Sequence, residues 1–270
     1  MLRRRDSRMK KPAWVIDKEK TRRDERAATV WLFGLHAVGD ALRNPARKKL
    51  RLVLTRNAAD RLGSAIAESS ITPEISDPRN FAAPLDPGSV HQGAALEVRP
   101  LDWGDARACC LPRDGRGLVV LLDRVSDPHN VGAILRSAEV FGANAVIATQ
   151  RHAAPETGAL AKTASGALER QPYLRVRNLS EEMTQLQEMG YVLIGLDGEA
   201  PQTLDATLAG LPPGPVGLVL GAEGPGLRDK TRETCDLVAR LPAAGAFGSL
   251  NVSNAAAVAL YAARHAARAR

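Results

Sequence analysis

One stretch, residues 118–148, constrains the fold more than any other, because the spacing of its apolar residues changes along its length. It opens with a continuous apolar run, 118–122, which is typical of a strand buried on both faces. Pro128 then marks a turn, apolar residues recur at helical spacing as far as the stop signal Gly142, and a second apolar run begins at Ala145. Strand, loop, helix and strand in this order predict a βαβ unit of a parallel sheet.

This unit carries two polar residues that a simple crossover does not need, Asn130 and Arg136. Six residues of α-helix correspond to about 240° of rotation. The two side chains therefore converge only if Asn130 belongs to the loop and Arg136 reaches back toward it. A capping asparagine and a solvated arginine account for this stretch equally well.

Strands and helices alternate through the second half of the chain, which predicts an α/β domain with a doubly wound parallel sheet over 117–270. With 270 residues, the chain is long enough for a second domain as well. The predicted strands are 118–124, 145–149, 174–176, 191–196, 216–220 and 237–241, and the predicted helices are 131–141, 156–169, 180–189, 226–234 and 252–267.

The first half of the chain predicts a smaller α/β domain over 30–100, followed by a linker over 101–116 that has turn formers and charges without periodicity. His91 and Gln92 precede Gly93 at the start of the last strand of this domain and can face RNA, but a turn at the entry to the strand is their simpler interpretation. The expected elements are a helix over 35–43, a strand over 50–54, a helix over 58–68 and a strand over 92–98.

Positive charge is concentrated in residues 1–29, where eleven Lys and Arg residues and five acidic residues leave a net charge of +6 out of +7 for the whole chain. An arm with so few apolar residues cannot bury a core, and we expect it to be disordered. It can add salt-dependent affinity for nucleic acid, and a tail that only improves solubility is the alternative.

The cysteine and hydropathy patterns exclude several classes of protein. None of the three cysteines forms a C-x-x-C pair, which argues against a structural metal site or a disulfide framework. No apolar run approaches the length of a bilayer span, and the N-terminus is too charged for a signal peptide. We therefore expect a cytoplasmic protein without a metal or a membrane segment.

Two further stretches combine flexible backbone with polar side chains. In VGLVLGAEGPGL, a buried strand runs into a glycine-rich loop with one carboxylate, Glu223, and this loop matches neither the dinucleotide fingerprint nor a P-loop. In LPAAGAFGSLNVS, the loop delivers Ser249, Asn251 and Ser253 at alternate positions before an alanine-rich helix. A helix cap at Asn251 or Ser253 explains one of these polar residues but not all of them.

Together, NVGAILRSA, LVLGAEGPGLR and LPAAGAFGSLNVSNAAA resemble the three ordered motifs of the SpoU/TrmH ribose 2′-O-methyltransferases of the SPOUT class. FGLHAV and VHQGAALEV are similar to the ribosomal-protein-like RNA-binding domain of the branch that modifies 23S rRNA. The resemblance implies a C-terminal deep trefoil knot, a homodimer with the last helix in its interface, and 2′-O-methylation of a guanosine ribose in 23S rRNA or in a ribosomal assembly particle.

The resemblance also implies a site for S-adenosylmethionine as methyl donor. Ala243 stands where the family usually has methionine, and we expect this to loosen the packing of the cofactor slightly. The implied cofactor-binding residues are small or apolar and lie on loops at strand ends: Leu220, Gly221, Leu241, Ala243, Ala244, Gly245 and Leu250.

The family's catalytic set falls on five polar residues of this chain. Arg136 is expected to clamp phosphate and orient the 2′-hydroxyl, because a guanidinium does not readily give up its proton. Glu223 and Asn130 would orient Arg136 or bind ribose, while Ser249 and Asn251 would hold the knot loop and the substrate. The implied catalytic residues are Asn130, Arg136, Glu223, Ser249 and Asn251.

Two alternatives remain open at this point. A tRNA ribose methyltransferase would share the motifs of 117–270 but usually lacks a separate N-terminal domain. A catalytically silent RNA-binding protein would keep the fold and lose turnover. Cofactor binding and turnover distinguish this last class from an enzyme.

Overall fold

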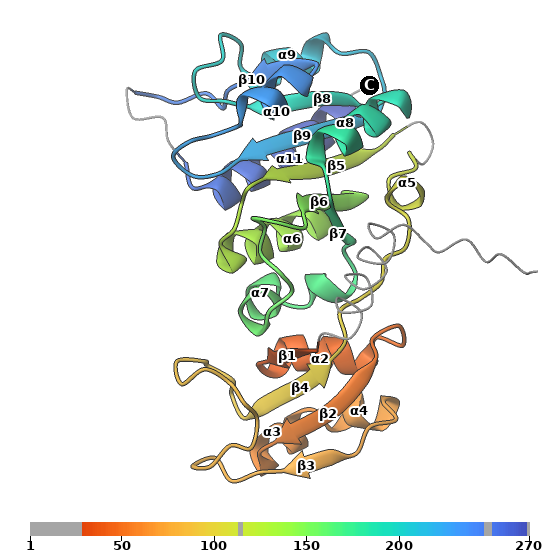
Figure 1. Cartoon of the computed structure of the whole chain (residues 1–270), viewed down its shortest axis with the longest axis vertical. Helices are drawn as coiled ribbons and strands as arrows, with labels where there is room; N and C mark the ends of the chain where they lie inside the picture. The colour runs from red at the N-terminus through yellow and green to blue at the C-terminus, as the bar shows by residue number, and fades with distance from the viewer. Residues whose placement is uncertain (1–28, 113–115, 246–249, 269–270) are drawn as a thin grey trace, which may run out of the picture.

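The structure, a computed structural model, describes residues 29–112, 116–245 and 250–268. The basic arm predicted over 1–29 lies outside the described residues except for its last residue, and Ser249 also lies outside them. Two sheets follow one another along the long axis of the molecule, with the N-terminal sheet at the bottom of Figure 1.

The described part of the first half of the chain forms a four-stranded sheet in the order β1-β4-β2-β3. Both β1 (Val30–Phe33) and β2 (Lys49–Leu54) pair antiparallel with β4 (Ala94–Val98), and β3 (Pro73–Ile75) pairs parallel with β2. The carboxyl ends of β2 and β3 and the amino end of β4 therefore share one edge of the sheet. The helices of this half are α2 (Leu35–Arg43), α3 (Arg56–Arg61) and α4 (Gly63–Glu68).

The second sheet has six strands among the described residues, all parallel, in the order β10-β8-β9-β5-β6-β7. This confirms the predicted α/β fold with a parallel sheet. Its central strands are apolar and fully buried, as strands covered on both faces must be. The strands are β5 (Leu118–Asp123), β6 (Ala145–Thr149), β7 (Tyr173–Val176), β8 (Val192–Leu196), β9 (Val216–Gly221) and β10 (Leu237–Ala239).

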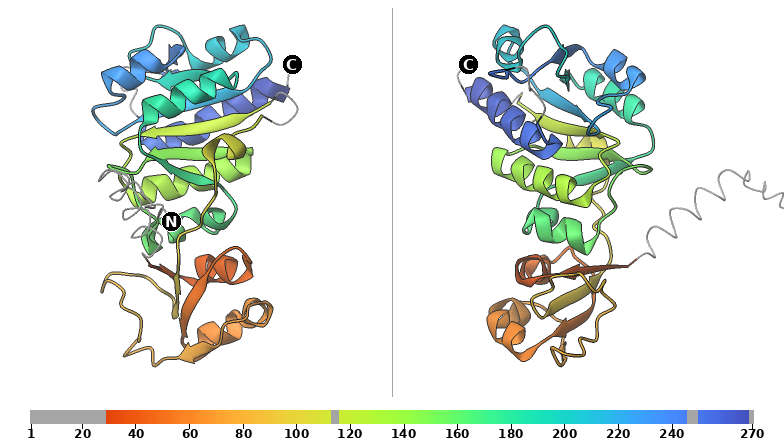
Figure 2. Two further views of the ribbon diagram at one scale, coloured as in Figure 1. Left: turned by 45° about the vertical axis from the view of Figure 1, so that its right-hand side comes forward. Right: turned by 90° about the vertical axis from the view of Figure 1, so that its left-hand side faces the viewer.

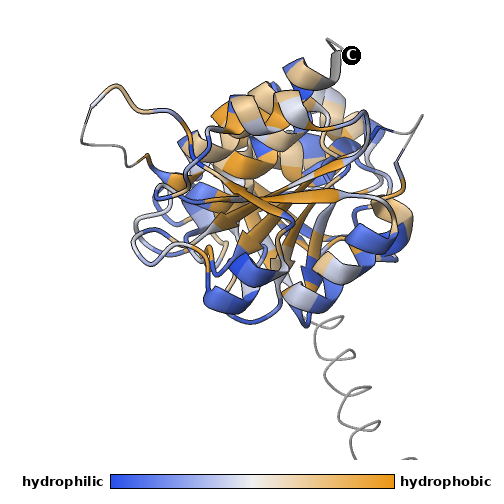
Figure 3. Ribbon diagram, turned by 90° about the horizontal axis from the view of Figure 1, so that it is seen from above, coloured by the Kyte–Doolittle hydropathy of each residue, from blue (hydrophilic) through white to orange (hydrophobic). Residues whose placement is uncertain are grey.

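Helices cover both faces of the parallel sheet, and apolar residues concentrate in the strands between them (Figures 2 and 3). One face packs against α6 (Pro128–Phe141), α7 (Gly158–Ala164), η1 (Ala167–Glu169), α9 (Leu204–Gly210) and α11 (Val252–Arg268). The other face packs against α5 (Ala106–Cys109), α8 (Leu179–Glu188) and α10 (Asp229–Thr234).

A packed interface joins the two sheets. Gly158 at the start of α7 lies against Phe33 of β1, where an added Cβ would come within 2.3 Å of the ring. Beside it, the buried guanidinium of Arg47 bonds Glu169 (Nη2 to Oε1, 2.7 Å) and Glu156 (Nη1 to Oε2, 3.0 Å). Burial raises the pKa of the Glu156 carboxyl, an effect that the neighbouring guanidinium opposes. The interface fixes the orientation of the N-terminal sheet on the larger one.

Several predicted elements differ from the observed ones. The helix predicted over 58–68 is two helices that meet at Leu62, and the helix predicted over 156–169 is α7 followed by η1. The segment 101–116, predicted to be irregular, contains α5, which is held by a hydrogen bond from the Tyr191 hydroxyl to the Cys110 carbonyl (2.7 Å). The prediction missed β1, β3 and α9, which are short elements that depend on contacts with distant parts of the chain.

Candidate active site

The three stretches singled out in the sequence meet at one edge of the parallel sheet. Asp123, the last residue of β5, pairs with Gly221, the last residue of β9, so the carboxyl ends of these strands lie side by side. The glycine-rich loop follows β9, α6 begins shortly after β5, and α11 packs against both α6 and β9. Open parallel sheets bind ligands in the crevice outside the carboxyl ends of their strands, which lie on the left in Figure 1.

Three predicted catalytic residues, Asn130, Glu223 and Asn251, form a hydrogen-bonded group that we call the Asn–Glu cluster. Glu223 Oε1 accepts Nδ2–H bonds from Asn130 (3.1 Å) and Asn251 (2.6 Å), and Asn251 Nδ2 also donates to Asn130 Oδ1 (2.9 Å). The backbone N–H of Val252 adds a longer bond to Oε1 (3.4 Å). Across the residues that the structure covers, Glu223 Oε2 has no hydrogen bond, so it remains able to accept one from a ligand.

Asn130 lies in the first turn of α6, so the predicted placement of Asn130 in the loop is wrong. Pro128 opens the helix, and the cap is Asp127, whose Oδ1 accepts the N–H of His129 (3.0 Å). Arg136 is exposed further along α6. Within 29–112, 116–245 and 250–268, no hydrogen bond or ion pair joins Arg136 to the Asn–Glu cluster, so a single chain does not bring it there.

Asn251 caps α11 and is also a member of the Asn–Glu cluster. Its Oδ1 accepts the backbone N–H of Ser253 (2.9 Å), and its main-chain carbonyl accepts the N–H of Ala255 (2.9 Å), which begins α11. Asn251, rather than Ser253, is therefore the cap that the sequence left open. Ser249 is outside the described residues, and its place relative to the cluster stays a prediction.

The loop that carries Glu223 is a tight turn that requires glycine. An added Cβ on Gly221 would lie 2.1 Å from the backbone carbon of Gly226, whose N–H closes the turn onto the Ala222 carbonyl (3.0 Å). Gly224 and Gly226 have positive φ values of 83° and 69°. The turn thus projects Glu223 toward α6 and α11.

An ion pair that sequence reasoning missed anchors this loop. The fully buried Asp123 carboxylate accepts Arg228 Nε–H (2.8 Å) through Oδ1 and the Arg228 backbone N–H (3.0 Å) through Oδ2. The signal was a single carboxylate at the end of an otherwise apolar strand run, because a buried charge requires a partner.

We expect Arg228→Met to lower the free energy of unfolding by roughly 1.5–3 kcal/mol, the range for hydrogen bonds to charged groups, because the buried Asp123 would keep only its backbone donor. Urea unfolding followed by circular dichroism measures this change. Arg232→Met, which breaks the more exposed pair with Asp197, is the matched control. Equal losses from the two variants would contradict the anchoring role of Arg228.

The residues predicted to hold the cofactor surround the same edge of the sheet. Leu220 is buried at the end of β9, Gly221 and Leu241 are half-buried, and Leu250 is 51% exposed just before α11. Residues 243–245 are exposed. An exposed leucine beside small residues and a glycine turn suits the apolar and adenine parts of S-adenosylmethionine, so the residues present fit this cofactor.

The described residues include neither a metal-binding group of side chains nor a membrane-spanning helix. In that part of the chain, no group of three or more His, Cys, Asp or Glu residues is placed to hold a metal ion. None of the helices described there is long and apolar enough to cross a bilayer.

A parallel sheet with a glycine-rich turn and a polar cluster at the carboxyl ends of neighbouring strands is the arrangement in which proteins of the α/β class bind ligands. Residues 117–261 match the SpoU rRNA Methylase family, and the chain belongs to this family. It is 39% identical over 238 residues to the 23S rRNA (guanosine-2′-O-)-methyltransferase RlmB of Vibrio vulnificus, covering 86% of this chain and 94% of that protein. The RlmB protein of Pseudomonas aeruginosa is also 39% identical, over 236 residues.

Solved structures agree with this fold. The SpoU methyltransferase AviRb from Streptomyces viridochromogenes, in complex with AdoMet, superposes with a TM-score of 0.72 at 24% identity and covers 92% of each chain. A protein of the TrmH family from Porphyromonas gingivalis superposes with a TM-score of 0.68 at 26% identity, over 91% of this chain and 92% of that one. The predicted resemblance to SpoU/TrmH enzymes is confirmed.

Proposed function

We propose that this chain transfers the methyl group of S-adenosylmethionine to the ribose 2′-hydroxyl of a guanosine in 23S rRNA. The observation that carries the proposal is the Asn–Glu cluster beside the glycine-rich turn in a chain of the SpoU family. The match to 23S rRNA methyltransferases extends over 86% of the chain and so includes much of the N-terminal half, which favours 23S rRNA over tRNA.

When bound, S-adenosylmethionine supplies a methyl group on a positively charged sulfur. We propose that Leu220, Gly221, Leu241 and Leu250 hold it together with residues 243–245. The support is that these residues are small or apolar and lie at strand ends of a parallel sheet. Ala243, in place of the family's methionine, gives the cofactor less side-chain contact there.

The polar residues position the ribose. We propose that the free Oε2 of Glu223 accepts a hydrogen bond from the ribose or from Arg136, and that Asn130 and Asn251 hold the glutamate in that orientation. Ser249 and Asn251 then secure the loop beside the substrate. Much of the acceleration comes from alignment of the hydroxyl oxygen with the methyl carbon, because well-oriented reactants avoid a large entropic cost.

A homodimer would supply the group that one chain lacks. Val140 on α6 is 71% exposed, and Tyr261 and Val258 on α11 are 56% and 48% exposed, so apolar side chains gather on the outer surface of these two packed helices. Arg136 lies one helical turn before Val140, on the same face of α6. We propose that a second copy docks on this surface and that Arg136 of each protomer clamps phosphate at the Asn–Glu cluster of the other.

A mixing experiment tests this arrangement. Arg136→Ala and Glu223→Ala homodimers are each expected to be inactive, whereas mixed dimers carry one intact composite site and should recover up to about a quarter of wild-type turnover per protomer if subunits exchange randomly, because half of all dimers are then mixed. Tyr261→Glu should shift the protein to a monomer in analytical ultracentrifugation. Absence of recovery in mixtures whose subunits demonstrably exchange would contradict the composite site.

Three finer features complete the proposal. We propose that 30–100 is an RNA-binding domain joined by the linker 101–116 to the catalytic domain 117–270, and that the enzyme acts in the cytoplasm. We also propose a deep trefoil knot at the C-terminus. Support for the knot comes from the course of the chain, since β10 lies at the outer edge of the sheet while the following α11 returns to β9 and α6.

The function is tested by incubating the purified protein and labelled S-adenosylmethionine with 23S rRNA, with ribosomal assembly particles, or with tRNA, each from cells that lack the enzyme. We expect label in one guanosine ribose of 23S rRNA, either naked or in particles. Label confined to tRNA would replace the substrate by the tRNA alternative. Cofactor binding without transfer to any of the three would identify a silent RNA-binding protein.

A further inference from the structure

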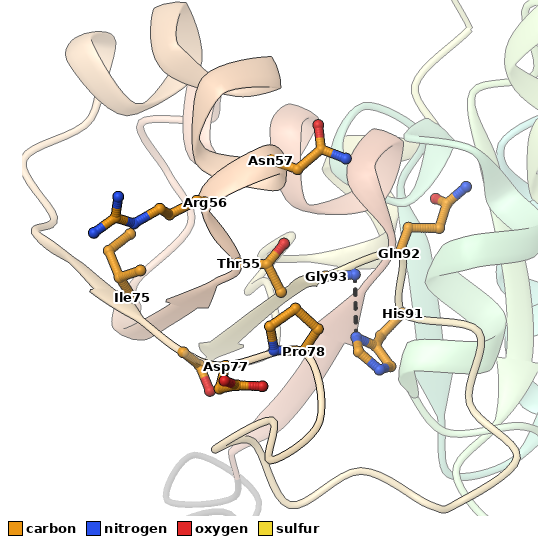
Figure 4. Close-up of a pocket in the computed structure, with 10 residues that line it drawn as sticks. Thr55, Arg56, Asn57, Ile75, Asp77, Pro78, His91, Gln92 and Gly93 are labelled. Atoms are coloured by element: carbon orange, nitrogen blue, oxygen red, sulfur yellow. Dashed lines mark hydrogen bonds between the residues drawn. The ribbon is translucent and has the colours of Figure 1, made fainter.

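A cavity of about 700 Å³ opens at the edge of the N-terminal sheet where β2 and β3 end and β4 begins. We call it the distal pocket. Its walls come from 55–57, 75–78 and 91–93, three segments that the catalytic chemistry does not use. Figure 4 shows Thr55 at the centre, Arg56 and Ile75 to one side, and Asp77, Pro78 and His91 below. The volume is typical of sites for small ligands.

The pocket is built on an unusual turn. Gln92 and Gly93 both have positive φ values, 54° and 77°, and a Cβ on Gly93 would lie 2.3 Å from Thr55 Oγ1. This turn brings His91 into the wall, where Phe81 stacks on its ring with centroids 4.2 Å apart and an angle of 23° between the planes. The simple turn role predicted for His91 and Gln92 is present, but it also shapes a binding surface.

Several polar groups in the wall are left for a ligand. His91 Nδ1 accepts the Gly93 N–H (3.1 Å), so the ring proton resides on Nε2, which can donate. Asp77 Oδ1 accepts the Arg79 N–H (2.7 Å). Where the chain is described, Arg56 and Asn57 are exposed and their side chains make no hydrogen bond or ion pair, and Asp77 Oδ2 makes no hydrogen bond.

This combination of groups matches an unpaired nucleotide. A nucleobase has a flat face and an edge of donors and acceptors, which aromatic, carboxylate, amide and imidazole groups recognise in single-stranded RNA. A guanidinium at the rim matches the phosphate that each nucleotide carries.

The carboxyl ends of β2 and β3, which border the distal pocket, lie on the same side of the molecule as the carboxyl ends of β5 and β9, which precede Asn130 and Glu223 (left in Figure 1). A series of contacts joins the two sites. The Gln92 side chain and the stem of Lys162 both lie within 4 Å of the Cβ position of Gly34, and Thr163, next along α7, bonds His129 (3.1 Å), the neighbour of Asn130. Lys162 and His129 are exposed along this path.

We propose that the distal pocket binds one unpaired nucleotide of the same RNA whose ribose is methylated, with its base in the cavity and its phosphate at Arg56. The proposal rests on the proposed RNA substrate. The N-terminal sheet would then recognise a single flipped-out nucleotide at a distance from the reaction, in addition to any attraction of RNA by its surface charge.

The test uses the double variant Arg56→Gln/Asn57→Ala, whose side chains have no partner to lose. The control is Arg61→Gln, which makes the same charge change on the same helix but lies outside the pocket wall. Binding of a 23S rRNA fragment is measured by fluorescence titration without turnover. We expect Kd to rise at least about tenfold in the double variant, because it loses the charge-assisted bond from Arg56 to phosphate and the amide of Asn57. In the control, which loses only one surface charge, we expect a rise of less than about twofold.

Photo-crosslinking of the same fragment carrying thio-substituted nucleotides provides an independent readout, and we expect one nucleotide to crosslink to the peptide that contains His91. An unchanged Kd in the double variant, or a Kd that rises equally in Arg61→Gln, would overturn the pocket. If RNA binding depends on Arg56 and Asn57 but no methyl transfer occurs, the pocket stands and the proposed function fails. If transfer occurs without this dependence, only the pocket fails.

Discussion

Replacing Glu223 by alanine is expected to lower kcat by about a hundredfold or more, the scale of rate loss when reacting groups are misplaced by about 1 Å. Glu223 Oε1 is the common acceptor for Asn130, Asn251 and the backbone of Val252. Without it, Asn130 and the backbone N–H of Val252 lose their acceptor, and of the cluster's hydrogen bonds only the one from Asn251 to Asn130 still links the start of α11 to α6. Single-turnover methyl transfer at saturating RNA and cofactor measures the loss.

Glu223→Gln separates charge from position, because it keeps an oxygen acceptor while removing the carboxylate. We expect its kcat to lie between wild type and Glu223→Ala. Glu233→Ala on α10, an exposed carboxylate away from the cluster, should leave kcat within about twofold of wild type, as surface substitutions generally do. A Glu223→Ala enzyme with near-normal kcat would remove the Asn–Glu cluster from the mechanism.

Replacing Arg47 by methionine is expected to lower the free energy of unfolding by about 3–5 kcal/mol, the usual cost of leaving buried charge without its partner. The Arg47 side chain is fully buried and is bonded to Glu156, Glu169 and the Arg99 carbonyl (2.9 Å). Burial already raises the pKa of Glu156 against the effect of the guanidinium, so its carboxylate would tolerate the loss poorly. Equilibrium unfolding in urea at neutral pH measures the change.

Arg51→Met is the matched control, because Arg51 forms an equally short bond with Glu74 (2.8 Å) but both side chains are about half exposed. Its expected cost is below about 1 kcal/mol. In Arg47→Met, neutralising both partners with Glu156→Gln and Glu169→Gln should restore much of the stability. A loss no larger than that of Arg51→Met would show that the buried network does not hold the two sheets together.

Local sequence signals account for most of the parallel sheet. The apolar run over 118–122, the turn at Pro128 and the stop at Gly142 are all interpretable within a few residues, and β5 and α6 follow them closely. The helix predicted over 35–43 coincides with α2 for the same reason, since its apolar face recurs at helical spacing.

What the sequence could not predict depends on contacts between distant residues. Arg47 is separated from Glu156 by 109 residues and from Glu169 by 122, so no local pattern reveals that the three charges share a buried site. The α9 helix was missed because its register depends on Leu204 and Leu208, which are buried on the face that α11 covers. The sequence pattern assigns Pro128 to the turn and so predicts Asn130 in the loop, whereas Pro128 is the first residue of the helix.

The same distinction between local motifs and distant contacts applies to the residues of the candidate site. Asn130, Glu223 and Asn251 were identified from three motifs, and the fold brings them within hydrogen-bond distance. Arg136 belongs to the first motif, but among the described residues it makes no hydrogen bond or ion pair with the cluster, and we propose that a second copy of the chain brings it there. Asp123 was overlooked since its role requires Arg228, 105 residues away.

Mass spectrometry of 23S rRNA tests most directly whether this protein methylates that RNA through the Asn–Glu cluster. The RNA comes from cells that lack the chromosomal gene and carry either the wild-type gene or a Glu223→Ala gene. We expect the wild-type gene to produce a single 2′-O-methylguanosine, and the Glu223→Ala gene to leave that ribose unmodified at an equal protein level. Wild-type cells with no such nucleotide, or full modification by the variant, would contradict the account.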